Sequence, residues 1–328
     1  MQASLKELRD RIDSVENTRK LTDAMRLVAA AKVRRAQEAV IGGRPFSENL
    51  VKVLYAVNQR LAGEDVNVPL TEVRDPVRSV LLVVCTGDRG LCGGFNSFVI
   101  RQVERRYKEL KDLGIDVKLL TIGSKGSNYF STRKEGYNIV ANFNIGQSPT
   151  TSDAQKIADE VYAEFVSKEV DKVELVYTKF VSLLKSTPTI QTMLPLKTTG
   201  QLTDQRGNPI DNPNDEIFLL TSQGGELTLE RERETPETSA LEGSISFEQD
   251  PSQILEALLP LYMNSQILRS LQESVASELA ARMNAMGAAS DNAEELSRNL
   301  NNTYQRLRQS QVTGELMEVV SAAEATSS

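Results

Sequence analysis

Histidine and tryptophan are absent from this 328-residue sequence, and cysteine occurs only twice, at Cys85 and Cys92. Without histidine, the Ser–His and Cys–His nucleophile pairs of many hydrolases cannot form. A structural zinc site is not expected either, because the sequence has neither histidine ligands nor a Cys-x-x-Cys pair. Two isolated cysteines are typical of buried, reduced thiols. We therefore expect no metal site and no histidine-activated nucleophile, and we predict neither a cofactor nor a catalytic residue for this chain.

Long apolar runs and an excess of positive charge are also missing. No stretch approaches the ~18 apolar residues of a membrane-spanning helix, and the formal net charge is −7. We therefore expect no direct insertion into a membrane and no general binding to nucleic acid. The N-terminal stretch "MQASLKELRDRIDSVEN" is rich in acids and lacks an apolar core, so it resembles neither a signal peptide nor a typical transit peptide.

What the sequence does contain is a helical pattern at each end. Apolar residues recur every three or four positions from Leu5 onward and predict a helix over residues 3–40. The stretch "IGGRPF" at 41–46 is predicted to interrupt this helix before the pattern resumes. The same spacing starts again at Pro251 and continues almost to the C-terminus, with Pro260 expected to kink only the first turns.

The C-terminal helix is too long for one compact domain, since about 70 residues of helix extend for about 105 Å. Such a helix needs a partner helix, surrounding subunits, or both. Its seam is rich in Ala, Ser and Asn, which favours close packing against the N-terminal helix rather than self-assembly. An intermolecular coiled-coil dimer remains the alternative.

Strand and helix patterns alternate between these ends and predict an α/β domain with a mostly parallel, Rossmann-like sheet. The predicted strands are "VRSVLLVVCTG", "DVKLLTIG", "YNIVANFN", "KVELVYTKFVS" and "TPTIQTMLPL", and the predicted helices are "SFVIRQVERRYKELKDLG", "SKGSNYFSTRKEG" and, capped by Ser152, "TTSDAQKIADEVYAEFVSKEVD". A Gly-, Asn-, Asp- and Pro-rich insertion carries a predicted β-hairpin around a Gly-Gly turn, and "SISFEQD" returns as a strand. The predicted domains are 1–60, 75–250 with the insertion 198–235, and 251–328.

The loop "TGDRGLCGGFN" at 86–96 lies between a predicted strand and a predicted helix, where many proteins bind phosphate. A P-loop needs Lys and Ser or Thr after its last glycine, and neither follows Gly94. The spacing Gly-x-x-Gly-x-x-Gly-Gly also differs from the dinucleotide pattern, and Asp88 would repel a phosphate. We therefore interpret the loop as a close-contact segment for a partner rather than a nucleotide site.

The two ends and this loop together resemble the gamma subunit of rotary ATP synthases. The stretches that carry the resemblance are "LRDRIDSVENTRKLTDAMRLVAAAKVRRAQ", "TGDRGLCGGFN" and "LYMNSQILRSLQESVASELAARMNAM", followed by "VTGELMEVVSAA". The insertion resembles the form found in chloroplasts and cyanobacteria. The resemblance implies an antiparallel coiled coil of the terminal helices inside a hexamer of alpha and beta subunits, with the α/β domain against the epsilon subunit and the membrane c-ring.

The resemblance implies a non-catalytic rotor that couples proton-driven rotation of the c-ring to conformational change in the catalytic beta subunits. The location it implies is peripheral, on the cytoplasmic or stromal face of the thylakoid membrane. A coiled-coil scaffold or adaptor is the alternative that the long helices alone would permit. A nucleotide-dependent enzyme is disfavoured by the missing histidine and phosphate-loop lysine.

The resemblance also implies which residues contact the alpha and beta subunits. They are Met25, Arg26, Lys32, Arg34, Arg35, Asp88, Arg89, Cys92, Arg308, Gln309 and Thr313. By composition alone, the basic cluster from Arg26 to Arg35 is typical of a solvated helix face. The green-plant chloroplast form carries a regulatory cysteine pair in the insertion, and the matching positions here are Thr203 and Pro209. We therefore expect no thiol switch, although the hairpin could still gate rotation by contact.

Overall fold

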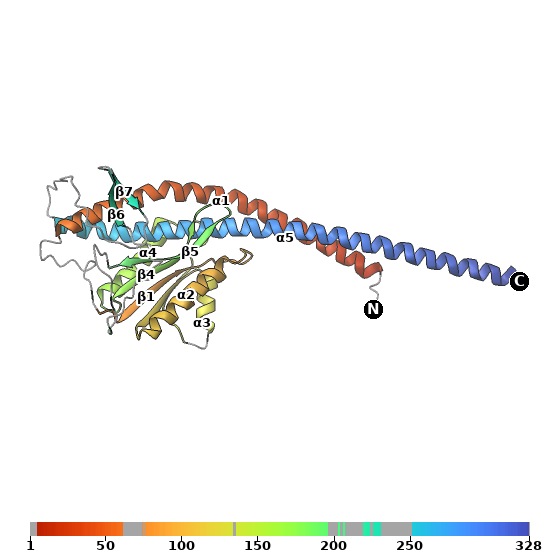
Figure 1. Cartoon of the computed structure of the whole chain (residues 1–328), viewed down its shortest axis with the longest axis horizontal. Helices are drawn as coiled ribbons and strands as arrows, with labels where there is room; N and C mark the ends of the chain where they lie inside the picture. The colour runs from red at the N-terminus through yellow and green to blue at the C-terminus, as the bar shows by residue number, and fades with distance from the viewer. Residues whose placement is uncertain are drawn as a thin grey trace. The chain divides into compact units, whose positions relative to one another are not determined.

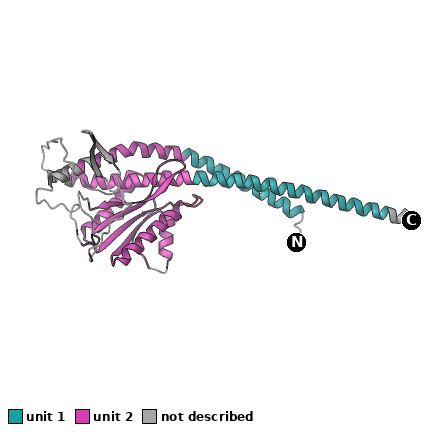
Figure 2. Ribbon diagram, in the orientation of Figure 1, with its two compact units in different colours: residues 1–31, 282–328 teal, residues 32–281 magenta. Residues whose placement is uncertain are grey.

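The computed structural model describes residues 5–61, 74, 76–133, 136–195, 203, 206, 219–223, 226–230 and 251–327. The chain divides into two compact units, which Figure 2 shows in different colours. Unit 1 comprises residues 1–31 and 282–328, and unit 2 comprises residues 32–281. The described part of unit 1 consists of two helical segments, whereas unit 2 contains a β-sheet together with the remaining parts of both helices.

The terminal helices are α1 (Leu5–Leu61) and α5 (Pro251–Ser327). In unit 1 their segments lie side by side and run in opposite directions (Figure 1). Arg26 of α1 lies against Gly287 of α5, where an added Cβ atom would meet the arginine Cδ at 3.4 Å. Small side chains such as Ala293 are buried in this unit. The predicted pairing of the two terminal helices is therefore confirmed.

Helix α1 is continuous where the sequence predicted an interruption. Gly42, Gly43 and Pro45 all lie inside the helix. A Cβ atom on Gly43 would lie 3.1 Å from the side-chain oxygen of Gln272, so the glycine lets α5 pack closely. Tertiary packing in unit 2 therefore overrides the low helix propensity of this stretch, and the predicted break was wrong. Helix α5 likewise contains Pro260 without ending there.

The sheet of unit 2 has five strands in the order β3-β2-β1-β4-β5. Their bounds are β1 (Ser79–Cys85), β2 (Asp116–Ile122), β3 (Asn138–Phe143), β4 (Lys172–Phe180) and β5 (Ser186–Leu194). Strand β1 pairs in parallel with β2 and β4, and β2 pairs in parallel with β3, whereas β5 is antiparallel to β4. The predicted mostly parallel sheet is confirmed.

Helices cover both faces of this sheet (Figure 1). Helices α2 (Phe95–Asp112) and α3 (Ser124–Thr132) pack on one face, and α4 (Thr151–Val166) packs on the other together with α1 and α5. Alternation along β1 separates the two cores, because Leu82 and Val84 face α2 while Leu81 and Val83 face α4 and α5. Both faces are apolar, so a strand such as β1 is one continuous apolar run in the sequence.

Two further predictions concern local structure. The predicted hairpin is confirmed as β6 (Leu219–Gln223) paired antiparallel with β7 (Glu226–Glu230). The N-cap of α4 is Thr150 rather than Ser152: the Thr150 hydroxyl accepts the backbone N–H of Asp153, and the Asp153 carboxylate accepts that of Thr150. The predicted strand at 244–250 lies outside the described residues, and the predicted domain boundaries stay predictions.

A buried ionic triad attaches α2 to the sheet. The Arg106 guanidinium donates to both oxygens of Glu174 at 2.6 and 2.9 Å, and Lys172 Nζ lies 2.9 Å from the same carboxylate. No side chain of the three is more than 4% exposed. Burial by itself would raise the pKa of Glu174, but the charges of Lys172 and Arg106 outweigh it and lower that pKa to about 2.

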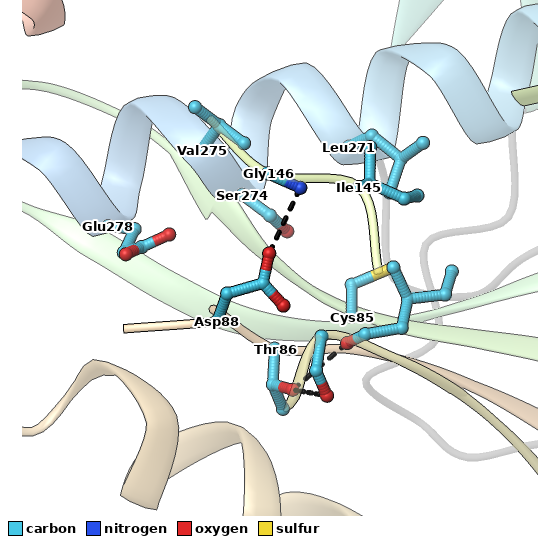
Figure 3. A pocket seen from close by; sticks show the side chains of 11 residues that line it. Cys85, Thr86, Asp88, Ile145, Gly146, Leu271, Ser274, Val275 and Glu278 are labelled. Atoms are coloured by element: carbon cyan, nitrogen blue, oxygen red, sulfur yellow. Dashed lines mark hydrogen bonds between the residues drawn. The ribbon is translucent and has the colours of Figure 1, made fainter. Parts of the chain in front are cut away.

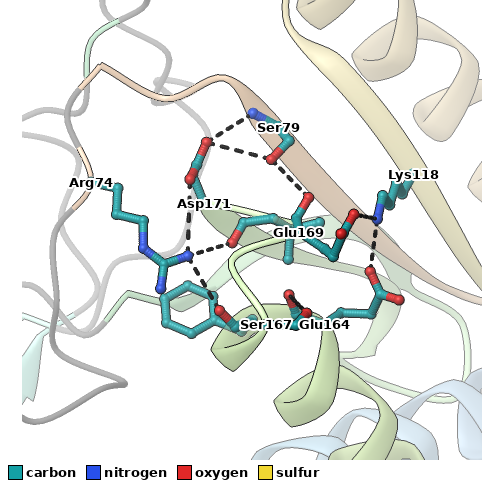
Figure 4. A network of polar contacts seen from close by, with 9 residues as sticks. Arg74, Ser79, Lys118, Glu164, Ser167, Glu169 and Asp171 are labelled. Atoms are coloured by element: carbon teal, nitrogen blue, oxygen red, sulfur yellow. Dashed lines mark hydrogen bonds and ion pairs between the residues drawn. The ribbon is translucent and has the colours of Figure 1, made fainter.

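A second polar network joins the start of β1 to the end of α4 and the start of β4 (Figure 4). The Asp171 carboxylate accepts the backbone N–H and the hydroxyl of Ser79. Arg74 donates to two backbone carbonyls, one in the last turn of α4 and one just before β4. Beside them, Lys118 pairs with Glu164 at 3.0 Å and with the more exposed Glu169 at 2.9 Å. These contacts satisfy backbone groups at the amino ends of the parallel strands.

Candidate functional site

The glycine-containing loop follows β1 at the carboxyl edge of the parallel sheet, where open α/β folds bind their ligands. Its central acidic residue is Asp88. One Asp88 oxygen accepts the backbone N–H of Ser124 at 2.8 Å and the Ser124 hydroxyl at 3.1 Å. The other oxygen accepts the backbone N–H of Gly146 at 3.0 Å, as Figure 3 shows. Asp88 therefore joins the loop to the first residue of α3 and to the segment after β3.

The position of Asp88 disfavours phosphate binding at this loop. The N–H groups at a helix N-terminus attract anions, and in phosphate-binding folds they contact the phosphate. Here the N-terminus of α3 at Ser124 already contacts a carboxylate of the same chain. A phosphate in this place would have to displace Asp88 or lie next to its charge. The loop thus lies where phosphate sites occur in such folds, but the Asp88 carboxylate occupies the position that a phosphate would take.

The space around this loop is also too small for a nucleotide. The cavity here has a volume of about 20 Å³ and is lined by residues of β1, β2, α5 and the adjoining loops, including Cys85, Asp88, Ser274 and Glu278 (Figure 3). That volume corresponds to about one water molecule, whereas ligand pockets measure roughly 300–1,000 Å³. Within the described ranges no group of three acidic or cysteine side chains is placed to hold a metal ion.

Two of the glycines are needed for close approach. A Cβ atom on Gly123 would lie 2.1 Å from the Thr86 carbonyl oxygen, and the φ of Gly123 is +94°, so no other residue fits there. A Cβ atom on Gly87 would lie 2.8–3.1 Å from the buried Glu278 carboxylate of α5. The loop is therefore pressed against α3 on one side and against α5 on the other.

The two cysteines are buried thiols, as predicted. Burial raises the pKa of Cys85 to about 12, and a hydrogen bond with Ser270 only partly offsets this effect. The Cys92 sulfur accepts from the Asn96 amide at 3.3 Å and lies 3.7 Å from the Arg89 carbonyl oxygen. Cys92 thus helps to shape the loop that presents the exposed Arg89 side chain. The Cys85 thiol, with its raised pKa, is expected to react poorly.

The predicted basic residues of α1 are exposed in both units. In unit 1, Arg26 pairs with Asp23 at 2.8 Å, and Met25 is partly buried. In unit 2, Lys32 donates to the Gln147 side chain at 2.7 Å, which links α1 to the segment before α4. Arg34 and Arg35 extend into solvent, with only a 3.7 Å contact between Arg34 and Glu38. An exposed pair of this kind contributes little to stability, so these charges are available to a partner.

The last described turns of α5 form a surface that no described residue of unit 1 covers. In residues 308–323 every side chain is exposed, including the predicted contact residues Arg308, Gln309 and Thr313. Large apolar side chains lie among them, namely Val312, Leu316, Met317, Val319 and Val320, each at least 48% exposed. We call residues 308–323 the distal segment. An exposed apolar surface of this kind is typical of a protein-binding site.

Sequence reasoning missed the charged residues on the buried face of α5 in unit 2. Arg269, Glu273 and Glu278 are each at most 5% exposed, although they occur in a stretch that otherwise shows a small-residue seam. Glu273 contacts Arg44 of α1, a residue that the sequence pattern also did not single out. The helical spacing held no signal for Arg269 and Glu273, because they fall roughly opposite Leu271 on the helix. They are buried because α5 is covered on nearly all sides between residues 262 and 280.

The two positions that match the regulatory cysteine pair of the chloroplast form are described only in part. The Thr203 carbonyl oxygen accepts the backbone N–H of Val77 at 3.0 Å, and Pro209 lies outside the described residues. Across the parts of the chain that the structure covers, no helix is both long enough and apolar enough to cross a membrane.

Comparisons with known proteins agree over nearly the whole chain. A family model described as ATP synthase matches residues 4–326. The chain is 62% identical to the chloroplastic ATP synthase gamma chain of Chlamydomonas reinhardtii, covering 99% of this chain and 90% of that protein. It is 57% identical to the chloroplastic gamma chain of Spinacia oleracea (98% and 88% covered) and 52% identical to the gamma chain of Trichormus variabilis (98% and 99% covered).

Solved structures show the same fold at lower identity. A chain from the central stalk and c-ring of the Tetrahymena thermophila mitochondrial ATP synthase matches with a TM-score of 0.56 and 23% identity, covering 82% of this chain and 99% of that one. A chain from the Euglena gracilis mitochondrial ATP synthase matches with a TM-score of 0.59 and 14% identity, covering 98% and 94%.

Proposed function

The chain belongs to the ATP synthase gamma family, and from this premise we propose that it is the central rotor shaft of a proton-translocating ATP synthase. Rotation of a membrane c-ring turns the chain inside a hexamer of alternating alpha and beta subunits. Its asymmetric contacts then favour a different conformation in each beta subunit in turn. The observation that carries the proposal is the distal segment, an exposed apolar surface on a long helix that requires surrounding subunits.

A non-catalytic role is supported by the carboxyl edge of the sheet. Asp88 is hydrogen-bonded to the start of α3, and the cavity there has room for about one water molecule. Coupling by a rotor requires differential contacts with its partners and no reacting group of its own. The chain therefore contributes to ATP synthesis and hydrolysis without binding the nucleotide.

The contacts with alpha and beta are proposed at three places. The exposed charges of α1, from Arg26 to Arg35, meet an acidic segment of the beta subunit, where opposite charge guides the contact. Arg89 is presented by the loop that Asp88 and Cys92 shape, so those two residues support the contact from inside. In the distal segment, Arg308, Gln309 and Thr313 provide the polar contacts among the apolar ones.

The remaining parts of the proposal concern the domains, the other partners and the location. The terminal segments 1–60 and 251–328 form the shaft, and residues 75–250 form the α/β domain that contacts the epsilon subunit and the c-ring. The relatives from chloroplasts support a thylakoid ATP synthase in a photosynthetic cell. The chain is then peripheral, on the stromal or cytoplasmic face of that membrane.

The insertion 198–235 is proposed to regulate rotation by contact, without a thiol switch. Thr203 and Pro209 stand where the switch cysteines are expected, so no disulfide can form between these positions. Deletion of 198–235 should change the inhibition of ATP hydrolysis, whereas dithiothreitol should not. An unchanged inhibition after the deletion would remove the regulatory role.

The main test is the ATPase activity of alpha and beta subunits with and without this chain. We expect strong activity that depends on the chain and is indifferent to reductant. Activity that is equal without the chain would refute the rotor proposal and favour a coiled-coil scaffold. A chain that binds ATP by itself would instead favour the nucleotide-dependent enzyme.

The contact residues can be tested by charge reversal. The double variant Arg34→Glu, Arg35→Glu should lower the chain-dependent ATPase activity, because it places acids against the acidic partner segment. The control is Lys108→Glu, an exposed charge on α2 in the same unit. If both variants lower the activity equally, the α1 charges have no specific role in the contact.

A further inference from the structure

A rotor transmits force only if its sheet and its long helices do not slide past one another under load. Unit 2 contains a contact between them that is suited to this task. It lies where α1, α5 and the end of β4 meet. The Glu273 carboxylate of α5 is completely buried, and one of its oxygens accepts from Arg44 Nε of α1 at 3.3 Å. The other oxygen accepts the backbone N–H of Phe180, the last residue of β4, at 3.3 Å.

The carbonyl group of the same residue is held as well. The Phe180 carbonyl oxygen accepts from Arg44 Nη2 at 2.7 Å, so Arg44 contacts both Glu273 and β4. Arg269, one turn before Glu273 on α5, donates to the carboxylate at 3.2 Å and adds a second cation, which is more deeply buried than Arg44. The contacts therefore close a ring through three elements that are distant in the sequence.

We infer that Arg44, Glu273 and the backbone N–H and carbonyl of Phe180 form a torque clamp, a contact that transmits rotational force between the sheet and the helix pair. This inference rests on the proposed rotor function and specifies how the α/β domain holds the shaft. Arg44 and Glu273 are positioning residues, because they would contact neither nucleotide nor beta subunit. We call the three groups the Phe180 clamp.

The reason is the directionality of charged hydrogen bonds. The apolar core between α5 and the sheet resists separation, but the hydrophobic effect that stabilises it has no preferred direction. A buried carboxylate differs, because a displacement of a few ångströms leaves it without its cations in a low-dielectric environment. The clamp therefore makes slippage costly at the point where force passes from the strand to the helices.

The neighbouring contacts between α5 and β4 resist sliding less strongly. Ser274 accepts the backbone N–H of Thr178 at 3.3 Å, and the Ser277 hydroxyl donates to the carbonyl of the same residue at 3.3 Å. These are neutral hydrogen bonds to the same strand. They fix the helix near β4 but carry no charge whose exposure or isolation would oppose movement.

The test compares Glu273→Gln with Glu174→Gln in the complete, membrane-reconstituted ATP synthase. Both variants neutralise a fully buried carboxylate of unit 2 that contacts two cations, but only Glu273 joins the sheet to α1 and α5. ATP hydrolysis and ATP-driven proton pumping are measured together. We expect the Glu273 variant to pump fewer protons for each ATP hydrolysed, and the loss to grow against a pre-formed proton gradient. The Glu174 variant should keep the wild-type ratio.

A second readout follows the clamp itself. The Phe180 amide should exchange its hydrogen about tenfold faster in the Glu273 variant, since it loses a hydrogen bond to a charged acceptor. Arg44→Lys should give an intermediate loss of coupling, because one ammonium cannot reproduce the two-pronged contact. If the Glu273 variant does not assemble, Arg44→Gln replaces it, since the Arg44 side chain is 32% exposed and tolerates change more easily.

The outcomes separate the two proposals. An unchanged pumping ratio in the clamp variants, or an equal loss in Glu174→Gln, would overturn the clamp while leaving the rotor function intact. A wild-type chain that fails to stimulate the alpha and beta subunits would overturn the rotor function itself.

Discussion

Neutralising Glu174 should destabilise the chain strongly, because it removes the buried charge that two buried cations share. In Glu174→Gln, the amide keeps the size of the side chain but removes the buried charge shared by Arg106 and Lys172. The remaining ion pair of Arg106, with Glu109 at 3.4 Å, is too exposed to replace it. The three groups are almost completely inaccessible to water, so neither cation can recover its hydration. Removing one partner from a buried ionic group costs about 3–5 kcal/mol. We expect a loss of this size in the free energy of unfolding.

Urea unfolding at pH 7, followed by tyrosine fluorescence, measures this loss. The matched control is Glu169→Gln, which removes an ion pair with Lys118 on the surface of the same unit. Because Glu169 is exposed, its variant should unfold close to the wild-type midpoint. Replacing the whole triad by Arg106→Met, Lys172→Met and Glu174→Leu should recover most of the stability, since no charge is then left uncompensated.

The pH dependence gives an independent check with a defined sign. The pKa of Glu174 is lowered from 4.5 to about 2 in the folded chain. The ionised carboxylate therefore stabilises the fold above about pH 4.5, and this contribution is lost as the pH falls toward 2. The difference between the wild type and Glu174→Gln should shrink over that range. If the Glu174 variant is as stable as the Glu169 control at pH 7, the buried carboxylate does not stabilise the fold in this way.

The candidate site provides three further predictions. Asp88→Asn should lower the free energy of unfolding by about 1–2 kcal/mol in urea, because the hydrogen bonds to the start of α3 lose their charge, and an unchanged midpoint would contradict this. Gly87→Ala should cost about 1–3 kcal/mol by overpacking against Glu278; Gly90→Ala, where the nearest side-chain atom is 3.9 Å away, is the control. Cys85 should resist iodoacetamide at about pH 8 in the native chain and react after unfolding, since its pKa is about 12. Rapid labelling of native Cys85 would show that it is not held in this buried environment.

The elements of the α/β domain were predictable because they depend on local pattern. A strand such as β1 is an apolar run bounded by turn residues, and α2 shows the helical spacing of its buried side chains. The failures occurred where local signals were ambiguous or were overridden. Thr150 and Ser152 are both good N-caps near Asp153, and only the backbone geometry selects Thr150. The glycines in α1 indicated a break until the packing of α5 was known.

The candidate site was predictable in what it lacks rather than in how it is built. A loop without a phosphate-loop lysine was not expected to bind a nucleotide, and this stays a prediction; the structure adds that the cavity beside the loop has a volume of about 20 Å³. Nothing local indicated that Asp88 would contact Ser124 and Gly146, which are 36 and 58 positions away in the sequence. The partner contacts of α1 and of the distal segment came from the resemblance and stay predictions.

The sequence by itself determined the long terminal helices, the parallel strands and the membership of the family, because periodicity and motif spacing act over a few residues at a time. Only the tertiary structure decided which charges are buried together. Arg44 and Glu273 are 229 positions apart, and their contact depends on how α1, α5 and β4 pack in unit 2. Spacing within one helix shows which face a charge occupies, but only the packed elements show which opposite charge compensates it.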